Sequence, residues 1–454
     1  MWQIGFGFLI FEQNRFIVFN FFNISLRFTG FPMKEAAIEF KKTQAICNDD
    51  FELFILLKKD AIVKYHLKNN KSYQKLVGNT SFNNWNELPV MTKKDFQKPL
   101  IERLSKGYTV NNVYVNKTSG SSGDPFVFAK DKFCHALTWV NIISRFKWFG
   151  IDFNASLQAR FYGIPLDFIG NKKERIKDFL SNRYRFTIFD LSDPVLENIL
   201  VKFQTKKFDY INGYTSSIVL FAKFLHRKDI VLKAICPTLK CCVVTSEMLF
   251  EDDKILMEKQ FGVPIINEYG ASELDLIAFE NPNGEWVVNS ETLFVEILDD
   301  DNTVLPNGKK GRIVITSLFN KAHPFIRYDI GDVGILDEKS TFRKPILKKL
   351  IGRTNDIAIL PSGKKSPGLT FYYVTKSIIE DDGNVKEFVI KQTKTDTFEV
   401  EYVSEKELTE NQIQDIKKAI TRYLESGLTF KFSRKEKLER SKSGKLKQFV
   451  SMLK

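Results

Sequence analysis

Short apolar runs alternate with helical stretches from about residue 110 onward, and this alternation limits the fold more than any other feature of the chain. The runs have the length of buried strands and lie at 157–162, 210–212, 240–244 and 264–267. Strands separated by helices form largely parallel sheets, because the helix carries the chain back to the edge where the strand began. We therefore predict an α/β core.

The segments before and after this core show other patterns. Residues 34–106 have a mostly helical pattern, whereas residues 284–350 have the short runs of strands and hairpins. A chain of 454 residues is too long for one ordinary core. We therefore expect residues 33–352 to form a large N-terminal domain with mixed and parallel sheets and a β-rich subdomain.

The remaining segment, residues 353–454, is predicted to be a small α+β domain. Two strands, expected at 387–390 and 397–402, precede an amphipathic helix. Thr409 and Gln412 have the spacing of a capping box at the start of that helix. Another strand is expected after the helix.

Composition narrows the class of protein. The net charge of +13 is compatible with nucleic acid or a membrane surface, with an anionic substrate such as ATP, or with a generally basic surface, which is the interpretation we favour. However, the lysines are spread along the chain and no nucleic-acid motif occurs, so we predict no nucleic-acid partner. The five cysteines form no CxxC pair and the four histidines no HxxxH pair. We therefore expect no structural zinc and a reducing, cytoplasmic setting.

The first 32 residues are rich in Phe and Ile, but polar residues interrupt them. No stretch reaches the ~18 apolar residues that a membrane-spanning helix needs. No basic segment precedes the first apolar run, which argues against a secretory signal. We expect Met33 to be the native start, residues 1–32 to be an uncertain extension, and no stable membrane insertion. A membrane-surface anchor is the alternative.

A loop of small and hydroxyl-bearing residues joins two strands expected at 112–115 and 126–129. Glycines expose backbone N–H groups and hydroxyls add donors, so that such a loop can hold phosphate oxygens. It is not a Walker loop, because no GK[ST] sequence follows. A flexible Ser/Gly hairpin is the alternative. The loop residues are Thr118, Ser119, Gly120, Ser121, Ser122 and Gly123.

A second motif, NEYGASE at 267–273, directly follows a predicted buried strand. Loops at the carboxyl ends of sheet strands are where α/β proteins bind ligands. Tyr269 offers a flat face for a base, Ser272 a hydroxyl, and Glu273 a hard oxygen ligand for Mg²⁺. An ordinary turn leading into a helix is the alternative.

Three further motifs follow in the chain. Asp332 comes after Gly331 at the expected entry to a strand, where a carboxylate can accept from both hydroxyls of a ribose. Arg353 follows a glycine. Lys445 lies on a Gly-flanked loop, where a lysine can place a compact charge beside a phosphoanhydride. A turn aspartate and a solvated basic tail are the alternatives.

The order and spacing of these five motifs closely resemble the adenylate-forming superfamily of acyl-CoA synthetases, adenylation domains and luciferases. Within it, the chain looks most like the phenylacetate–CoA ligase branch, which includes capsular polysaccharide biosynthesis relatives. The segments WNELPVMTKKD at 85–95 and DYINGYTSS at 209–217 carry this likeness. The resemblance covers roughly residues 70–450.

The resemblance implies roles for the first two motifs. The small-residue loop at 118–123 holds the pyrophosphate part of ATP. Tyr269 stacks on adenine, with Ser272 beside the nucleotide, and Glu273 helps to hold Mg²⁺.

It also implies roles for the later motifs. Asp332 binds the ribose, and Arg353 supports the ribose or the phosphates. Lys445 is the lysine essential for adenylation. The C-terminal domain is mobile in the family and swings about a pivot that matches Asn355, where relatives often have Asp or Lys.

The implied activity is ATP-dependent activation of a small carboxylic acid as an acyl-AMP, followed by transfer to coenzyme A. Tyr214 and Ser246 are the candidates for lining the acyl site. The acid itself is left open among aryl acids, amino acids and sugar acids. The oligomeric state is expected to be a monomer or homodimer.

Two alternatives remain open. One is the same adenylation chemistry with an amine or a carrier thiol as acceptor, in surface polysaccharide or secondary-metabolite assembly. The other is a basic nucleic-acid- or membrane-binding protein without turnover.

Overall fold

The computed structural model describes residues 30–78, 84–118, 126–163, 168–188, 191–353, 357–363, 365–367, 385–423, 425–440 and 446–453. The chain divides into two compact units. The first unit contains the chain up to Glu296 together with residues 314–329 and 336–348. The second contains residues 297–313, 330–335 and 349–454. The domain boundary after residue 352 stays a prediction.

Helices dominate the chain before the first hairpin, as the pattern of residues 34–106 predicts. The 3₁₀ helix η2 begins with a capping box, in which the Thr92 backbone N–H donates to the Asp95 carboxylate at 2.7 Å. Among the described residues, every helix is too short or too polar to cross a membrane. The helices are α3 (Met33–Ala45), α4 (Asn48–Asn69), α5 (Lys71–Val77), η1 (Trp85–Glu87), η2 (Lys93–Phe96) and α6 (Leu100–Arg103).

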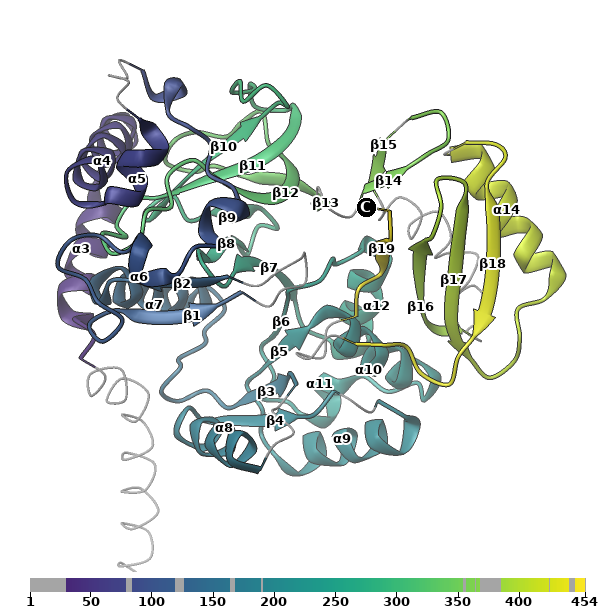
Figure 1. Cartoon of the computed structure of the whole chain (residues 1–454). Helices are drawn as coiled ribbons and strands as arrows, with labels where there is room; N and C mark the ends of the chain where they lie inside the picture. The colour runs from purple at the N-terminus through teal and green to yellow at the C-terminus, as the bar shows by residue number, and fades with distance from the viewer. Residues whose placement is uncertain are drawn as a thin grey trace, which may run out of the picture. The chain divides into compact units, whose positions relative to one another are not determined.

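A seven-stranded sheet forms the centre of the first unit, with the order β4-β3-β5-β6-β7-β8-β9 (Figure 1). Its first five strands are parallel, which confirms the predicted α/β core. β8 and β9 are antiparallel, so the sheet is mixed. The strands are β3 (Gln158–Phe161), β4 (Arg183–Phe186), β5 (Tyr210–Tyr214), β6 (Cys241–Thr245), β7 (Ile265–Ala271), β8 (Asp275–Glu280) and β9 (Trp286–Val288).

The two faces of this sheet pack against different helices. Phe161, Ile211 and Cys242 lie in one core cluster, together with residues of α9 (Asp193–Thr205), α10 (Thr215–Arg227), α11 (Leu232–Ile235) and α12 (Glu251–Phe261). Tyr210 and Cys241 lie in another cluster with α7 (Lys132–Lys147). Neighbouring residues of a strand point to opposite faces, so Cys241 and Cys242 lie on different faces of the sheet. Because helices cover both faces, both cysteines are fully buried as small apolar groups. All five cysteines are free. The helix α8 (Phe168–Leu180) precedes β4.

The Ser/Gly loop is confirmed to join a hairpin. Strands β1 (Tyr114–Lys117) and β2 (Val127–Lys130) pair antiparallel, with Lys117 opposite Val127. These strands begin one or two residues later than the sequence predicts.

The strand-rich character of residues 284–350 is also confirmed. A four-stranded sheet has the order β10-β11-β12-β13, and a small sheet pairs β14 with β15. The strands are β10 (Leu293–Leu298), β11 (Lys310–Ser317), β12 (Tyr328–Leu336), β13 (Leu347–Arg353), β14 (Ile357–Ile359) and β15 (Lys365–Pro367).

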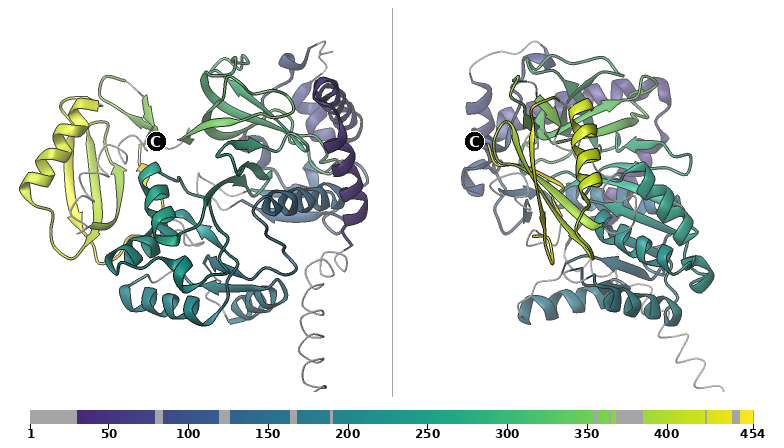
Figure 2. Two further views of the ribbon diagram at one scale, coloured as in Figure 1. Left: turned by 180° about the vertical axis from the view of Figure 1, so that it is seen from behind. Right: turned by 90° about the vertical axis from the view of Figure 1, so that its right-hand side faces the viewer.

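In its described residues, the C-terminal part of the second unit is a small sheet with one helix, drawn in yellow and green (Figures 1 and 2). The strand order is β18-β17-β16-β19. The predicted capping box is confirmed: the Thr409 backbone N–H donates to Gln412 Oε1 at 2.8 Å, and the Gln412 N–H donates to Thr409 Oγ1 at 3.3 Å. The elements are β16 (Val385–Gln392), β17 (Thr397–Ser404), α14 (Glu410–Tyr423), β18 (Thr429–Arg434) and β19 (Phe449–Ser451).

Gly213 gives a test of packing in the parallel sheet. A Cβ at this position would collide with the Phe161 carbonyl oxygen on the neighbouring strand and lie 2.5 Å from Phe161 Cβ. We predict that Gly213→Ala lowers the free energy of unfolding by about 3 kcal/mol in urea denaturation. At Gly78 a Cβ meets no atom within 4 Å, so Gly78→Ala should cost only the backbone strain of its φ of 73° and ψ of −162°, about 2 kcal/mol. Equal losses in the two variants would contradict this packing argument.

Candidate functional site

The base of the Ser/Gly loop is closed by two hydrogen bonds. The Thr118 backbone N–H donates to the Phe126 carbonyl oxygen at 3.0 Å, and Thr118 Oγ1 accepts from the Phe126 N–H at 3.1 Å. Thr118 therefore helps to hold the two ends of the loop together. The other predicted phosphate-binding residues lie outside the described part of the chain, and their role stays a prediction; they are Ser119, Gly120, Ser121, Ser122 and Gly123.

The NEYGASE motif lies in a β-hairpin, which corrects the expectation of a loop after a short strand. β7 continues through Ala271, because its second half pairs antiparallel with β8, and Tyr269 is opposite Ala278. Tyr269 is a buried strand residue whose ring meets the Trp286 ring edge-on at 6.0 Å between centroids. Ser272 and Glu273 lie in the turn between the two strands.

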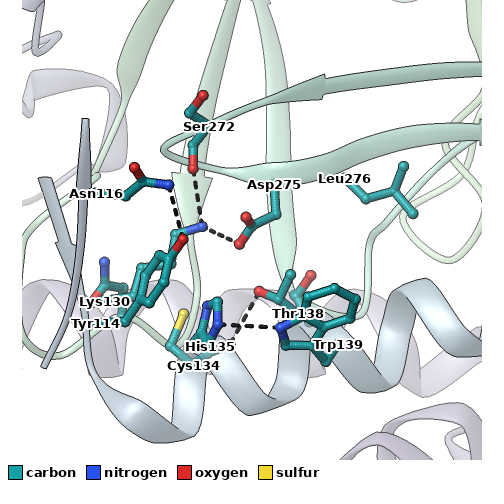
Figure 3. A network of polar contacts seen from close by, with 12 residues as sticks. Tyr114, Asn116, Lys130, Cys134, His135, Thr138, Trp139, Ser272, Asp275 and Leu276 are labelled. Atoms are coloured by element: carbon teal, nitrogen blue, oxygen red, sulfur yellow. Dashed lines mark hydrogen bonds and ion pairs between the residues drawn. The ribbon is translucent and has the colours of Figure 1, made fainter. Parts of the chain in front are cut away.

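Lys130 joins the loop-bearing hairpin to this turn (Figure 3). It is the last residue of β2, and only 3% of its side chain is exposed. Its ammonium group forms an ion pair with the Asp275 carboxylate and donates to the Ser272 carbonyl oxygen at 3.5 Å. The hairpin that carries the Ser/Gly loop and the turn with Ser272 and Glu273 are therefore held together by a partly buried charge pair, in which 21% of the Asp275 side chain is exposed.

Glu273 is linked to the loop by a second route. Its carboxylate is buried, and Oε1 accepts from the Tyr328 hydroxyl at 3.0 Å. Tyr328 is fully buried and meets the rings of Phe96 and Phe126 edge-on, at centroid distances of 5.2 and 6.4 Å. Because Phe126 also closes the loop through Thr118, one aromatic cluster positions both the loop and the Glu273 carboxylate.

His135 packs against the same hairpin (Figure 3). Its ring stacks on Tyr114 at 3.8 Å between centroids, and Nε2 accepts from Trp139 Nε1 at 3.2 Å. Burial lowers the pKa of His135 to about 4, so the imidazole is neutral at neutral pH. Burial, with a contribution from Asp275, raises the pKa of the Tyr114 hydroxyl. Both groups therefore support the hairpin as uncharged rings.

The two predicted substrate residues follow neighbouring parallel strands. Tyr214 is the last residue of β5 and is opposite Thr245 of β6, and Ser246 comes next. Tyr214 is buried against the Tyr162 ring at 4.7 Å, whereas Ser246 is exposed with a φ of +71°. Non-glycine residues with positive φ concentrate at functional sites. The structure thus brings both residues to the carboxyl ends of the parallel strands.

The remaining predicted residues belong to the second unit. Asp332 lies in the middle of β12 rather than at the entry to a strand, because the strand continues through Gly331 with its φ of +84°. Asp332 is buried. Arg353 is the last residue of β13. Asn355 and Lys445 lie outside the described residues, and the roles of all four residues stay predictions.

Sequence reasoning missed three residues that shape the site, Lys130, Asp275 and Tyr328. Lys130 directly ends the apolar run at 126–129, and a lysine in that position is an available signal for a buried ion pair. Tyr328 lies four residues before the predicted ribose-binding Asp332, but its partner Glu273 is 55 residues away in the chain.

Comparison with known proteins adds sequence relatives. No protein-family model matches the chain. The chain is similar to Protein CapK from Staphylococcus aureus, with 25% identity over 335 residues that cover 68% of this chain and 69% of that protein. It is also similar to phenylacetate–coenzyme A ligase from Aromatoleum evansii, with 25% identity over 170 residues, or 34% of this chain and 38% of that enzyme.

Solved structures give a comparison of the fold. The crystal structure of 2-hydroxyisobutyryl-CoA ligase with R3-HIB-AMP in the postadenylation state matches with a TM-score of 0.67, at 14% identity, over 87% of this chain and 88% of that one. Anthranilate CoA ligase with anthranoyl-AMP matches with a TM-score of 0.51, at 15% identity, over 73% and 64% of the two chains. The chain therefore has the fold of these adenylate-forming ligases.

These matches confirm the resemblance that the motifs carry, as well as its α/β fold with mixed sheets. The chain is a distant homologue of CapK and of phenylacetate–CoA ligase. Within the superfamily fold, the Lys130 and Tyr328 contacts join the segments that carry its first two motifs.

Removal of the buried lysine tests the link between hairpin and turn. Lys130→Met leaves the Asp275 carboxylate without its cation, and we predict a loss of about 3 kcal/mol in the free energy of unfolding. Asp275→Asn keeps the shape and tolerates the φ of +59° at this position. The double variant should lose less than the sum of the two single losses. Additive losses in urea unfolding would show that the pair is not coupled.

Three buried histidines predict how stability depends on pH. Burial lowers the pKa of His66 and His135 to about 4 each, and the pKa of His323 well below its ordinary value. Between pH 6.5 and 4 the unfolded chain binds protons that the folded chain does not, so stability should fall as the pH falls through this window. Each histidine contributes at most about 1.4 kcal/mol per pH unit.

Urea unfolding at several pH values measures this slope. His135→Phe keeps a ring against Tyr114 but removes one titrating group, so its stability should fall less steeply than that of the wild type. An unchanged slope would contradict the assignment to His135.

Proposed function

We propose that the protein is an ATP-dependent ligase that activates a carboxylic acid as an acyl-AMP and transfers the acyl group to coenzyme A. One of its distant relatives is by name a phenylacetate–coenzyme A ligase. One observation carries the proposal. The aromatic cluster of Phe96, Phe126 and Tyr328 positions both the base of the Ser/Gly loop and the Glu273 carboxylate.

In this proposal the loop at 118–123 holds the phosphates of ATP through its backbone N–H groups and hydroxyls. Tyr269 and Ser272 contact the adenosine part of the nucleotide. Asp332 binds the ribose hydroxyls, and Arg353 supports the ribose or the phosphates.

The Glu273 environment fits a magnesium ion that arrives with the nucleotide. Tyr328 holds one oxygen of the carboxylate, and among the described residues no hydrogen bond engages the other. The described residues contain no group of three or more His, Cys, Asp or Glu that could hold a metal by themselves. One carboxylate together with substrate phosphates is the usual protein contribution to a Mg²⁺ site. Mg²⁺ would supply neutralisation of the phosphate charge.

The chemistry needs no covalent residue. An oxygen of the substrate carboxylate attacks the α-phosphorus of ATP, the bond to the β-phosphate oxygen breaks, and pyrophosphate leaves. Lys445 provides positive charge where the carboxylate and the phosphates meet, so catalysis rests on positioning and charge neutralisation.

Acyl transfer completes the reaction. The thiol sulfur of coenzyme A attacks the acyl carbonyl carbon, AMP leaves, and the thiol proton is released to solvent. In our proposal the C-terminal domain is mobile, with Asn355 as its pivot, and it moves Lys445 away before this step. An amine or a carrier thiol would be used in the same way.

Pyrophosphate release tests the proposal. With ATP, Mg²⁺ and a panel of carboxylic acids, the wild type should release pyrophosphate with at least one acid. Lys445→Ala and Glu273→Gln should lower the rate by about 100-fold, since each removes a charge that stabilises the transition state. The matched controls are Lys437→Ala and Glu258→Gln, at exposed positions, which should keep the wild-type rate.

Coenzyme A is then added to identify the acceptor. Formation of an acyl-CoA supports coenzyme A as the acceptor. Turnover only with an amine or a carrier protein would show that this other group is the acceptor. Failure of the wild type both to bind ATP and to release pyrophosphate would overturn the proposed function and favour the basic surface as the binding element.

A further inference from the structure

A group of polar side chains lies on the sheet face that packs against α7, toward the carboxyl ends of the parallel strands. Side chains two residues apart on a strand share a face, so Asn212 lies above Tyr210, and Glu268 lies above Ile266. We call this group the polar sheet cluster. Its members are the strand residues Gln158, Arg160, Asn212, Thr245 and Glu268, together with Tyr162, which follows β3 and packs against the apolar cluster of the opposite face.

Hydrogen bonds fix the amides and hydroxyls of the polar sheet cluster. Asn212 Oδ1 accepts from the Tyr162 hydroxyl at 3.2 Å and from Gln158 Nε2 at 3.4 Å. Asn212 Nδ2 donates to the Val243 carbonyl oxygen at 3.2 Å. The central amide is therefore held in one orientation.

Arg160 is the member whose bonding capacity is least used. Its guanidinium lies over the Tyr162 ring, 4.0 Å from the centroid, and Nη1 donates to Gln158 Oε1 at 3.4 Å. Nε is buried, and neither an acceptor for Nε nor an ion pair to Arg160 occurs among the described residues. A buried N–H of a cation without an acceptor is unfavourable, so it indicates a position prepared for an anion.

The surrounding charges add to this positive field. Arg183 on the neighbouring strand β4 forms no ion pair among the described residues, and burial together with Arg160 lowers its pKa to about 10. Glu268 is the carboxylate of the cluster, and loss of hydration raises its pKa, while Thr245 and Arg160 act in the opposite direction. Glu268 thus acts on Arg160, whereas Asp178, which pairs with Arg185, acts on Arg183.

The fold itself does not need these polar groups. On the opposite face the same strands carry Phe161, Ile211 and Val244, which pack in an apolar core. Polar side chains at the carboxyl ends of parallel strands are typical of ligand sites. The cluster also adjoins both predicted substrate residues, because Tyr162 packs on Tyr214, and Thr245 precedes Ser246.

We propose that the polar sheet cluster binds the acyl part of the substrate, and that this acid carries a second carboxylate, which pairs with Arg160. The inference rests on the proposed function and narrows it, because it favours dicarboxylic acids over plain aryl or alkyl acids. A guanidinium offers a planar fork of donors that matches a carboxylate. The Tyr162 ring and the Gln158 side-chain amide contact the guanidinium. Asn212 holds both of them in place through its hydrogen bonds.

Calorimetric titration without ATP tests the inference. The probes are two matched pairs, glutarate with its mono-amide glutaramate, and terephthalate with its mono-amide terephthalamate. The wild type should bind a diacid at least about tenfold more tightly than its mono-amide, as expected for a charge-assisted hydrogen bond. Arg160→Gln should abolish this difference. Arg227→Gln, at an exposed arginine paired with Asp193, should retain it.

Equal affinity for each diacid and its mono-amide, or no binding of either diacid to the wild type, would overturn the inference. So would a difference that survives in Arg160→Gln. Thermal unfolding without ligand separates a binding role from a structural one: Arg160→Gln should keep the wild-type Tm, and a fall of several degrees would also overturn the inference.

Pyrophosphate release with the same acids separates the inference from the proposed function. An acid that binds in the Arg160-dependent way but releases no pyrophosphate with ATP counts against the ligase activity alone. If a plain monocarboxylic acid causes pyrophosphate release at a rate that Arg160→Gln does not change, the ligase activity is supported and the second-carboxylate inference is overturned.

Discussion

The ion pair between Lys130 and Asp275 joins two segments that are 145 residues apart in the chain, and the rest of the site depends on that junction. One segment is the hairpin that carries the Ser/Gly loop, and the other is the turn that carries Ser272 and Glu273. Burying a charge pair contributes little net stability, because desolvation opposes the Coulomb attraction. The pair therefore matters for where it places the two segments. The Tyr328–Glu273 hydrogen bond fixes the same junction from the other side.

The parallel sheet supplies the second requirement of the site, a row of strand ends that can carry different chemistry. One face of β3, β5 and β6 is apolar and packs on helices, so it stabilises the fold. The other face changes from apolar to polar toward the carboxyl ends of the strands. At these ends Tyr214 is the last residue of β5 and Ser246 follows β6, and Arg160, Asn212 and Glu268 lie close to them. The sheet thus separates groups that build the apolar core from the polar groups of the proposed acyl site.

Much of this architecture follows from local sequence patterns. The parallel core was predictable because its strands are short apolar runs between helices, and the helix start at Thr409 was predictable because a capping box involves residues three apart. The β7–β8 hairpin was not, since the NEYGASE segment has no local sign of its antiparallel partner and was expected to be a loop. The strand position of Asp332 was missed for a similar reason, because Gly331 looks like a turn when its neighbouring strands are unknown.

An oxygen-18 label in the carboxyl group of the substrate tests adenylation most directly. In the proposed reaction one carboxylate oxygen forms the bond to the α-phosphorus and stays with it when the acyl group leaves. Mass spectrometry should therefore find one labelled oxygen in AMP after a single turnover in unlabelled water. Label in inorganic phosphate with ATP converted to ADP, or AMP without label, would contradict the assignment of this chain as a ligase that acts through an acyl-AMP.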